Sequence, residues 1–321
     1  METNVIHLQD CIQGMLELPA QSIDIVSTSP PYNLGIEYGT YKDNKPRQEY
    51  LDWLDSVFAA VKHCLKENGH FWLNVGYSNI DPWVGMDVAQ VARNHFVLQN
   101  NFNWVKSISI DDVTTGHFKP INSRRFANPT WEHLFHFTKT GEVPCDKLAI
   151  GVPYMWDCNI DNSGRIKGRL AKKYGFDNIK DFNKNATAEV KEKLESEFAD
   201  KIKSVKPKPD KRCRGNSWFV PYDTIANRKK HRGSHPATYP VALVENCIKF
   251  SGLTSGVLVD PFMGSGTSAI ASIRQGLDYI GFDIDSNYRQ FALDRIADET
   301  DGLSENEYQT LEDTGFFKIT T

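Results

Sequence analysis

The stretch VLVDPFMGSGT, residues 257–267, decides the fold of this chain of 321 residues. Its apolar start predicts a buried strand over 256–259, and a glycine turn leads from that strand directly into a helix over 267–275. Gly264 and Gly266 have no side chain, so the backbone there can approach a ligand closely. The stretch therefore indicates a strand-turn-helix unit that holds a ligand.

A second strand, predicted over 279–282, strengthens this interpretation. It ends in Asp283, which lies 17 residues after Gly266. A nucleotide-binding β-α-β unit places a carboxylate at this point, where it accepts hydrogen bonds from ribose hydroxyls. The two strands together predict a nucleoside-containing cofactor, although the spacing alone also fits a dinucleotide-dependent enzyme.

The segment TSPPYN, residues 28–33, follows directly after an apolar strand predicted over 22–27. Its two prolines fix the backbone and remove two N–H donors, which holds the carbonyls of Ser29 and Pro30 in a set direction. Tyr32 offers an aromatic face on which a planar ring can stack. Taken alone, the segment fits a rigid turn with a core tyrosine as well as it fits a binding loop.

Strands and helices alternate in both halves of the chain, which indicates an α/β fold with a parallel sheet covered on both faces. Further strands are predicted over 70–75, 102–110 and 131–138. Helices are predicted over 48–66, where Asn68 and Gly69 stop the helix, and over 84–98, 239–250, 267–275 and 287–297. A polar loop is expected over 111–129.

The segment 143–232 interrupts this pattern, because it is rich in lysine and has few long apolar runs. From Asp161 to Arg232 the chain has 20 Lys and Arg against 10 Asp and Glu, a net charge of +10. The whole chain carries −4, so the remainder carries −14. A basic insertion in an acidic chain predicts a polyanion-binding face, and a solvated helical surface is the alternative.

Several classes of protein are excluded by composition. No stretch approaches eighteen consecutive apolar residues, and Met1 to Gln9 lacks a basic patch followed by an apolar run, so neither a membrane span nor a secretory signal is expected. The six cysteines include no CxxC pair, which argues against a zinc site or a disulfide framework. A cytoplasmic protein without a metal is therefore expected.

Together the two motifs resemble those of the amino-methyltransferases of DNA restriction-modification systems. That family carries an FxGxG cofactor loop, here Phe262 to Gly266, and a (D/N/S)PP(Y/F) catalytic loop, here Ser29 to Tyr32. The catalytic loop comes first, which resembles the β group of the family, in which a target recognition domain lies between the two loops. The resemblance implies a Rossmann-like S-adenosylmethionine-dependent methyltransferase fold with this domain inserted.

The resemblance also implies a division of the chain and a set of site residues. The expected parts are a catalytic half over 1–142, an inserted target recognition domain over 143–232, a cofactor-binding half over 233–300 and a C-terminal tail over 301–321. The catalytic residues would be Ser29, Pro30, Pro31 and Tyr32. S-adenosyl-L-methionine would be bound by Asp10, Thr28, Asp260, Phe262, Gly264, Ser265, Gly266, Thr267 and Asp283. The charge pattern adds expected DNA contacts at Arg124, Arg125, Arg228, Lys229, Lys230 and Arg232.

The implied substrate is double-stranded DNA, whose target base must be flipped out of the helix to reach the catalytic loop. Tyr32 is expected to stack on this base through its ring rather than to act through its hydroxyl. The Ser29 hydroxyl and the Pro30 carbonyl are expected to accept hydrogen bonds from the exocyclic amino group, which then attacks the sulfonium methyl in line. Family members with serine in the first position mostly methylate cytosine N4, so Ser29 favours that atom.

Other functions remain open at this point. Adenine N6 is the nearest alternative target, an RNA base or a protein glutamine amide is a second, and a catalytically silent DNA-binding paralogue is a third. Carbon-5 methylation needs a cysteine nucleophile, but neither Pro144-Cys145 nor Glu245-Asn246-Cys247 follows a sheet strand that bears a motif, so both are interpreted as chance matches. The resemblance leaves open a cognate restriction endonuclease that acts separately, and it leaves open a homodimer.

Overall fold

The computed structural model describes residues 1–36, 40–110, 113–116, 121–153, 162–203, 211–222 and 239–301. The chain forms two compact units. The large unit comprises Met1–Ile150 and Arg214–Thr321, and the small unit comprises Gly151–Cys213. Among the described residues, no helix is long and apolar enough to span a membrane.

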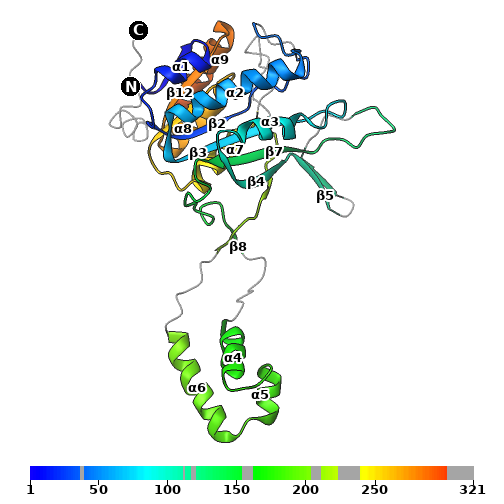
Figure 1. Ribbon diagram of the computed structural model, residues 1–321, viewed down its shortest axis with the longest axis vertical. Helices are drawn as coiled ribbons and strands as arrows, with labels where there is room; N and C mark the ends of the chain where they lie inside the picture. The colour runs from blue at the N-terminus through cyan, green and yellow to red at the C-terminus, as the bar shows by residue number, and fades with distance from the viewer. Residues whose placement is uncertain are drawn as a thin grey trace. The chain divides into compact units, whose positions relative to one another are not determined.

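The large unit is built on an eight-stranded sheet in the order β1-β12-β11-β2-β3-β7-β4-β10 (Figure 1). Its strands are β1 Val5–Leu8, β2 Ile23–Thr28, β3 Leu65–Val75, β4 Val97–Val105, β7 Trp131–Thr138, β10 Ser217–Phe219, β11 Val257–Asp260 and β12 Asp278–Asp283. Neighbouring strands are parallel except at β7, which runs antiparallel to both β3 and β4. A separate hairpin consists of β5 Ser107–Ile110 and β6 Val113–Gly116. The predicted α/β fold is therefore confirmed.

Helices cover both faces of this sheet. One face packs against α1 Cys11–Glu17, α2 Arg47–Cys64 and α3 Val84–Ala92, and the other packs against α7 Val241–Phe250, α8 Thr267–Gln275 and α9 Ser286–Asp301. Successive strand residues alternate between the two layers, as the pleat of a strand requires. Ile25 and Trp72 lie in the α7–α9 layer, whereas Val26 and Phe71 lie in the α1–α3 layer.

Two predicted helices are shorter than their sequence pattern indicated. The helix predicted over 48–66 ends at Cys64, before the expected stop at Asn68 and Gly69. Leu65 is already extended and fully buried, and it opens β3 opposite Ile23 of β2. The helix predicted over 84–98 ends at Ala92, because Val97 and Leu98 pair with the end of β7. At the C-terminal end of each of these two helices, strand pairing thus overrides the local helix propensity.

The described part of the small unit contains three helices: α4 Asn162–Lys173, α5 Ile179–Asn185 and α6 Ala188–Lys203. They close over a small core of Leu170, Ala171, Phe182 and Leu194. A two-stranded pairing of β8 Val152–Pro153 with β9 Lys211–Arg212 joins its ends. The small unit covers fewer residues than the insertion expected over 143–232. Trp218 and Val220 fall within that expected range, but they are buried in the core of the large unit.

Candidate active site

The sheet order brings the two sequence motifs together. β11 and β2 are parallel neighbours, with Leu258 opposite Ile25 and Val259 opposite Val26. Their carboxyl ends therefore lie at the same edge, where ligands bind in open α/β sheets. The loop after β11 and the loop after β2 consequently flank one site, although more than 220 residues separate them in the sequence.

Asp260 links these two loops through hydrogen bonds to both of them. Its carboxylate accepts hydrogen bonds from Thr28 Oγ1 at 2.6 Å and from the Phe262 backbone N–H at 3.0 Å. Ser268 Oγ and the Tyr239 hydroxyl donate to its second oxygen. Burial raises the pKa of Asp260, and these four donors oppose that shift. Asp260 and Thr28 are 1% and 3% exposed and do not line the cavity, and their contact with the cofactor stays a prediction.

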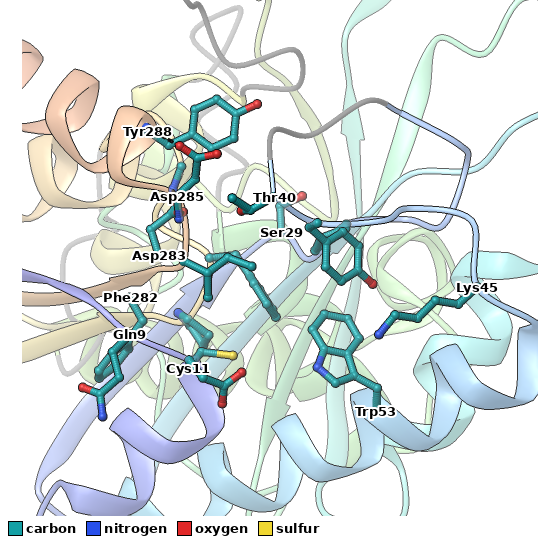
Figure 2. A pocket seen from close by; sticks show the side chains of 17 residues that line it. Gln9, Cys11, Ser29, Thr40, Lys45, Trp53, Phe282, Asp283, Asp285 and Tyr288 are labelled. Atoms are coloured by element: carbon teal, nitrogen blue, oxygen red, sulfur yellow. Dashed lines mark hydrogen bonds between the residues drawn. The ribbon is translucent and has the colours of Figure 1, made fainter.

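A cavity of about 250 Å³ lies at this edge of the sheet (Figure 2). Four of the predicted cofactor residues line it, together with two residues of the catalytic loop: Asp10, Phe262, Gly264, Asp283, Ser29 and Pro31. Further lining residues were not predicted from the sequence: Gln9, Cys11, Thr40, Tyr41, Lys45, Trp53, Pro261, Phe282, Ile284, Asp285 and Tyr288.

Asp283 is the most strongly perturbed acid of the cavity. It accepts hydrogen bonds from the backbone N–H groups of Gly264 at 2.9 Å and Asp285 at 2.8 Å. Burial nevertheless raises its pKa to about 6. Gly264 adopts a φ of +51°, which favours glycine, and its backbone thereby meets the carboxylate. The predicted pairing of the glycine turn with the acid at the end of β12 is thus present.

Other predicted cofactor residues have structural partners. Gly266 begins α8 with a φ of +77°, and a Cβ there would lie 3.0 Å from Ala292 of α9. The positive φ and the close approach of Ala292 both favour glycine at this position. Ser265 and Thr267 are each 4% exposed. Asp10 lines the cavity but also caps α1, since its Oδ1 accepts from the N–H groups of Ile12 and Gln13.

The wall opposite Asp283 combines aromatic rings with one cation (Figure 2). Lys45 Nζ lies 5.2 Å from the ring centres of both Tyr41 and Trp53. Trp53 in turn lies 5.5 Å from Phe262. Carboxylates of the protein can accept hydrogen bonds from ribose hydroxyls, and its aromatic rings can stack on a purine. The lysine ammonium can pair with a carboxylate of the ligand. This set of groups fits S-adenosylmethionine, which combines all three parts.

The catalytic loop enters a hydrogen-bond network through the Tyr32 hydroxyl. This oxygen lies 2.7 Å from Ser29 Oγ, 3.2 Å from Asn74 Oδ1 and 3.1 Å from Glu132 Oε2. Lys106 Nζ contacts the other carboxylate oxygen of Glu132 at 2.9 Å. Burial and then the Glu132 charge raise the pKa of Tyr32 well above its usual value. The Tyr32 hydroxyl is thus hydrogen-bonded to three side chains of the site, and the expectation that Tyr32 acts through its ring stays a prediction.

Sequence reasoning missed the partners of Tyr32 because they come from distant strands. Asn74 lies near the end of β3, whereas Glu132 lies at the start of β7. Since β7 is antiparallel, its first residues meet the carboxyl ends of its neighbours, and Glu132 reaches the same edge as Tyr32. The one available signal was an acid placed next to the otherwise buried apolar and histidine residues of this strand.

Tyr32 is also fixed by packing. A Cβ at Gly76 would lie 2.6 Å from its ring, so only glycine leaves room for the ring in this position. The Tyr50 hydroxyl donates to the Pro31 carbonyl at 2.8 Å, and the Asn33 amide donates to the Lys45 carbonyl. The loop therefore has a defined shape before any substrate binds.

The predicted DNA contacts lie only partly within the described residues. Arg124 and Arg125 are exposed, and the Arg125 guanidinium lies 4.8 Å from the Phe126 ring. Arg228, Lys229, Lys230, Arg232 and the tail from residue 302 lie outside the described residues.

Neither of the cysteines considered for carbon-5 chemistry, Cys145 and Cys247, lines the cavity. Cys247 is 1% exposed within α7. Cys145 has a half-buried thiol beside His70 and His136, and the three could in principle hold a metal. However, His70 Nδ1 and His136 Nε2 already lie 2.9 Å apart in a hydrogen bond. Burial lowers the pKa values of these two histidines to about 4 and about 3, so both rings are neutral.

Comparisons with known proteins agree with this geometry. The model of a DNA methylase family, N6_N4_Mtase, matches residues 23–294. The type II methyltransferase M.ScaI of Streptomyces caespitosus is 26% identical over 298 residues, which cover 92% of this chain and 81% of that protein. The DNA adenine methyltransferase YhdJ of Escherichia coli is 22% identical over 292 residues, with coverages of 91% and 82%.

Solved structures share the fold. The PvuII DNA methyltransferase, which is cytosine-N4-specific, aligns with a TM-score of 0.62 at 17% identity and covers 98% of this chain and 93% of its own. TTHA0409 of Thermus thermophilus, solved with S-adenosyl-L-methionine, aligns with a TM-score of 0.51 at 20% identity and covers 93% and 97%. Because the family model spans most of the sequence, the chain belongs to the N6_N4_Mtase family of DNA methylases.

Proposed function

We propose that this DNA methyltransferase transfers a methyl group from S-adenosylmethionine to N4 of a flipped-out cytosine in duplex DNA. The observation that carries the proposal is the position of Ser29, which lines the cofactor cavity while its hydroxyl bonds to Tyr32. The hydroxyl can thus contact a base that reaches the edge of the cavity. S-adenosylmethionine, when bound there, supplies an electrophilic methyl group.

The chain's own residues would activate the amino group of the base. Its lone pair is delocalised into the ring, which makes it a poor nucleophile. Hydrogen bonds to Ser29 Oγ and to the Pro30 carbonyl would hold the nitrogen pyramidal and localise the lone pair. Tyr32 would stack against the base, and the loop, already fixed by Tyr50, would provide orientation and oriented dipoles without a covalent intermediate.

The choice of cytosine over adenine rests on Ser29. The relatives include an adenine methyltransferase, YhdJ, and the structural neighbours include the cytosine-N4-specific PvuII enzyme. Adenine N6 is therefore the second candidate target. Serine at the first position of the catalytic loop supports cytosine because family members with serine there mostly methylate N4.

We further propose that the segment 143–232 provides target recognition. In the small unit within it, Lys167 pairs with Glu195 and Lys173 pairs with Glu197, which neutralises part of its positive charge. The excess charge, together with exposed Arg124 and Arg125, supports contact with DNA phosphates. A separately acting restriction endonuclease and a homodimer are compatible with this proposal and are not required by it.

A transfer assay with labelled S-adenosylmethionine tests the reaction class. Duplex DNA should accept label from the wild-type chain, whereas RNA and glutamine-containing protein should not. Ser29→Ala should lower the rate on DNA and leave cofactor affinity unchanged, because its hydroxyl contacts the base rather than the cofactor. Labelling of RNA or protein alone, or of no substrate at all, would contradict the proposal.

A further inference from the structure

The hydrogen atoms of the Ser29–Tyr32–Glu132 network can be placed by counting donors. Asn74 Nδ2 donates to the His133 carbonyl at 2.9 Å, so its Oδ1 faces Tyr32 as an acceptor. The Glu132 carboxylate oxygen beside Tyr32 also only accepts. The single Tyr32 hydrogen must therefore be donated to one of these two oxygens.

This assignment determines the role of Ser29. Tyr32 has no second hydrogen for the Ser29 oxygen, so at 2.7 Å Ser29 must donate its own hydrogen to the Tyr32 oxygen. Ser29 Oγ then has only lone pairs left to offer. An exocyclic amino group needs an acceptor of this kind for one of its hydrogens.

Glu132 is the fixed end of the chain of hydrogen bonds. Its Oε1 pairs with Lys106 Nζ at 2.9 Å, and the two side chains are only 13% and 10% exposed. The ammonium also lies 5.7 Å from the Trp104 ring centre and 5.5 Å from that of Tyr222. The carboxylate is therefore held in place from one side and presents Oε2 to Tyr32 from the other. Charged partners make such hydrogen bonds stronger than neutral ones.

We propose that Ser29, Tyr32 and Glu132 form the path by which the amino proton leaves the methylated base, with Glu132 as a positioning residue that acts through Tyr32. The inference rests on the proposed function and adds a residue to it. It also changes the expected role of Tyr32, whose hydroxyl becomes as important as its ring.

The step balances without a further reactant. The nitrogen lone pair forms the N–C bond to the methyl group, and the C–S bond breaks with its electron pair going to sulfur. One amino proton passes to Ser29 Oγ as the Ser29 proton passes to the Tyr32 oxygen and the Tyr32 proton passes to Glu132 Oε2. The products are a neutral methylated amine, a thioether and a protonated Glu132, which returns its proton to solvent after the product leaves.

Two variants and a matched control test this path. Tyr32→Phe removes the hydroxyl and leaves the ion pair of Glu132 with Lys106 intact. Glu132→Gln keeps the shape of the side chain and removes its charge. The control is Glu67→Gln, because Glu67 also pairs with a lysine, Lys139 at 3.2 Å, but is 63% exposed near the opposite end of β3.

Single-turnover methyl transfer is the main measurement, with S-adenosylmethionine affinity measured by calorimetry. Tyr32→Phe and Glu132→Gln should each lower the rate by about a hundredfold, a usual value for lost proton transfer, with unchanged cofactor affinity. The double variant should be no slower than the worse single variant, since both break one path. The wild-type rate should fall in D₂O, and Tyr32→Phe should lose this sensitivity. Glu67→Gln should behave as wild type in every measurement.

These measurements distinguish a failure of the proton path from a failure of the proposed function. A wild-type chain that methylates DNA while Tyr32→Phe is equally fast overturns the proton path and leaves the proposed function standing. The same holds if the losses of Tyr32→Phe and Glu132→Gln multiply in the double variant. If Glu132→Gln does not fold, Tyr32→Phe alone decides. A wild-type chain that methylates no DNA overturns the proton path and the proposed function together.

Discussion

The cofactor side of the active site, around Gly264 and Asp283, is built differently from the catalytic side, around Tyr32. On the cofactor side, Gly264 and Asp283 bond directly and lie 19 residues apart in the sequence. On the catalytic side, the Tyr32 hydroxyl joins residues from one loop and two strands, β3 and β7, and its partner Glu132 is 100 residues away. The contact of Gly264 with Asp283 therefore lies within one local β-α-β unit, whereas the Tyr32 network depends on long-range strand pairing. Variants on the two sides should separate affinity from rate.

The largest effect is expected on the catalytic side. Tyr32→Ala removes both the stacking face and the hydroxyl, and stacking alone is worth about 1–3 kcal/mol per base. Since loss of the hydroxyl alone is expected to cost about a hundredfold, the single-turnover rate should fall by about a thousandfold or more, with cofactor affinity unchanged. An equal loss of cofactor affinity, measured by calorimetry, would show that the two sides are not separable.

DNA affinity should depend on residues that belong neither to the cofactor side nor to the catalytic side. Replacing Arg228, Lys229, Lys230 and Arg232 together by alanine should weaken binding to a target duplex by about tenfold or more and flatten its salt dependence, because each phosphate contact contributes to the slope. Cofactor affinity should not change. An unaltered salt slope in a titration at several salt concentrations would remove this cluster from the DNA interface.

Substitutions on the cofactor side should lower the affinity for S-adenosylmethionine. Asp283→Ala removes acceptors for ribose hydroxyls, and two hydrogen bonds of about 1 kcal/mol each correspond to on the order of tenfold or more weaker S-adenosylmethionine binding. Asp278→Ala is the matched control, since Asp278 opens the same strand and bonds Asn4 instead. Calorimetry that gives equal affinities for both variants would contradict the ribose role of Asp283.

The smallest effect is a pH dependence on the same side. The pKa of Asp283 is about 6 because of burial, so the carboxylate that accepts from the cofactor is lost as the pH falls through that value. Cofactor affinity should decrease about threefold to fourfold from pH 7.5 to 5.5, and Asp283→Asn should remove most of this change. The sign for folding is opposite: the raised pKa means that this group stabilises the free protein fully below about pH 3.8 and loses that contribution as the pH rises through about 6.

The sequence predicts the cofactor side better than the catalytic side for a physical reason. The turn at Gly264 and the acid at Asp283 are fixed by local geometry, so spacing alone places them. The roles of Glu132 and Lys106 depend on the antiparallel direction of β7, which no local pattern encodes. Likewise Trp53 lines the cavity from α2, a helix whose sequence pattern indicates only that one face is buried.

The same contrast explains where individual expectations changed. Gly266 has the glycine that the motif requires, and it is favoured both by a local φ of +77° and by the close approach of Ala292 of α9, which depends on tertiary packing. Thr28 and Asp260 adjoin the motifs, but they bond to each other and do not line the cavity. Adjacency in the sequence to a binding loop therefore did not imply a place in the cavity lining.

Nucleoside mass spectrometry of duplex DNA methylated by the wild-type chain tests the central claim most directly. We predict N4-methylcytosine as the product, which Ser29→Ala should form more slowly without changing its identity. N6-methyladenine as the sole product would contradict the role assigned to Ser29 in choosing cytosine. 5-Methylcytosine, or no methylated base with any DNA, would contradict the mechanism itself.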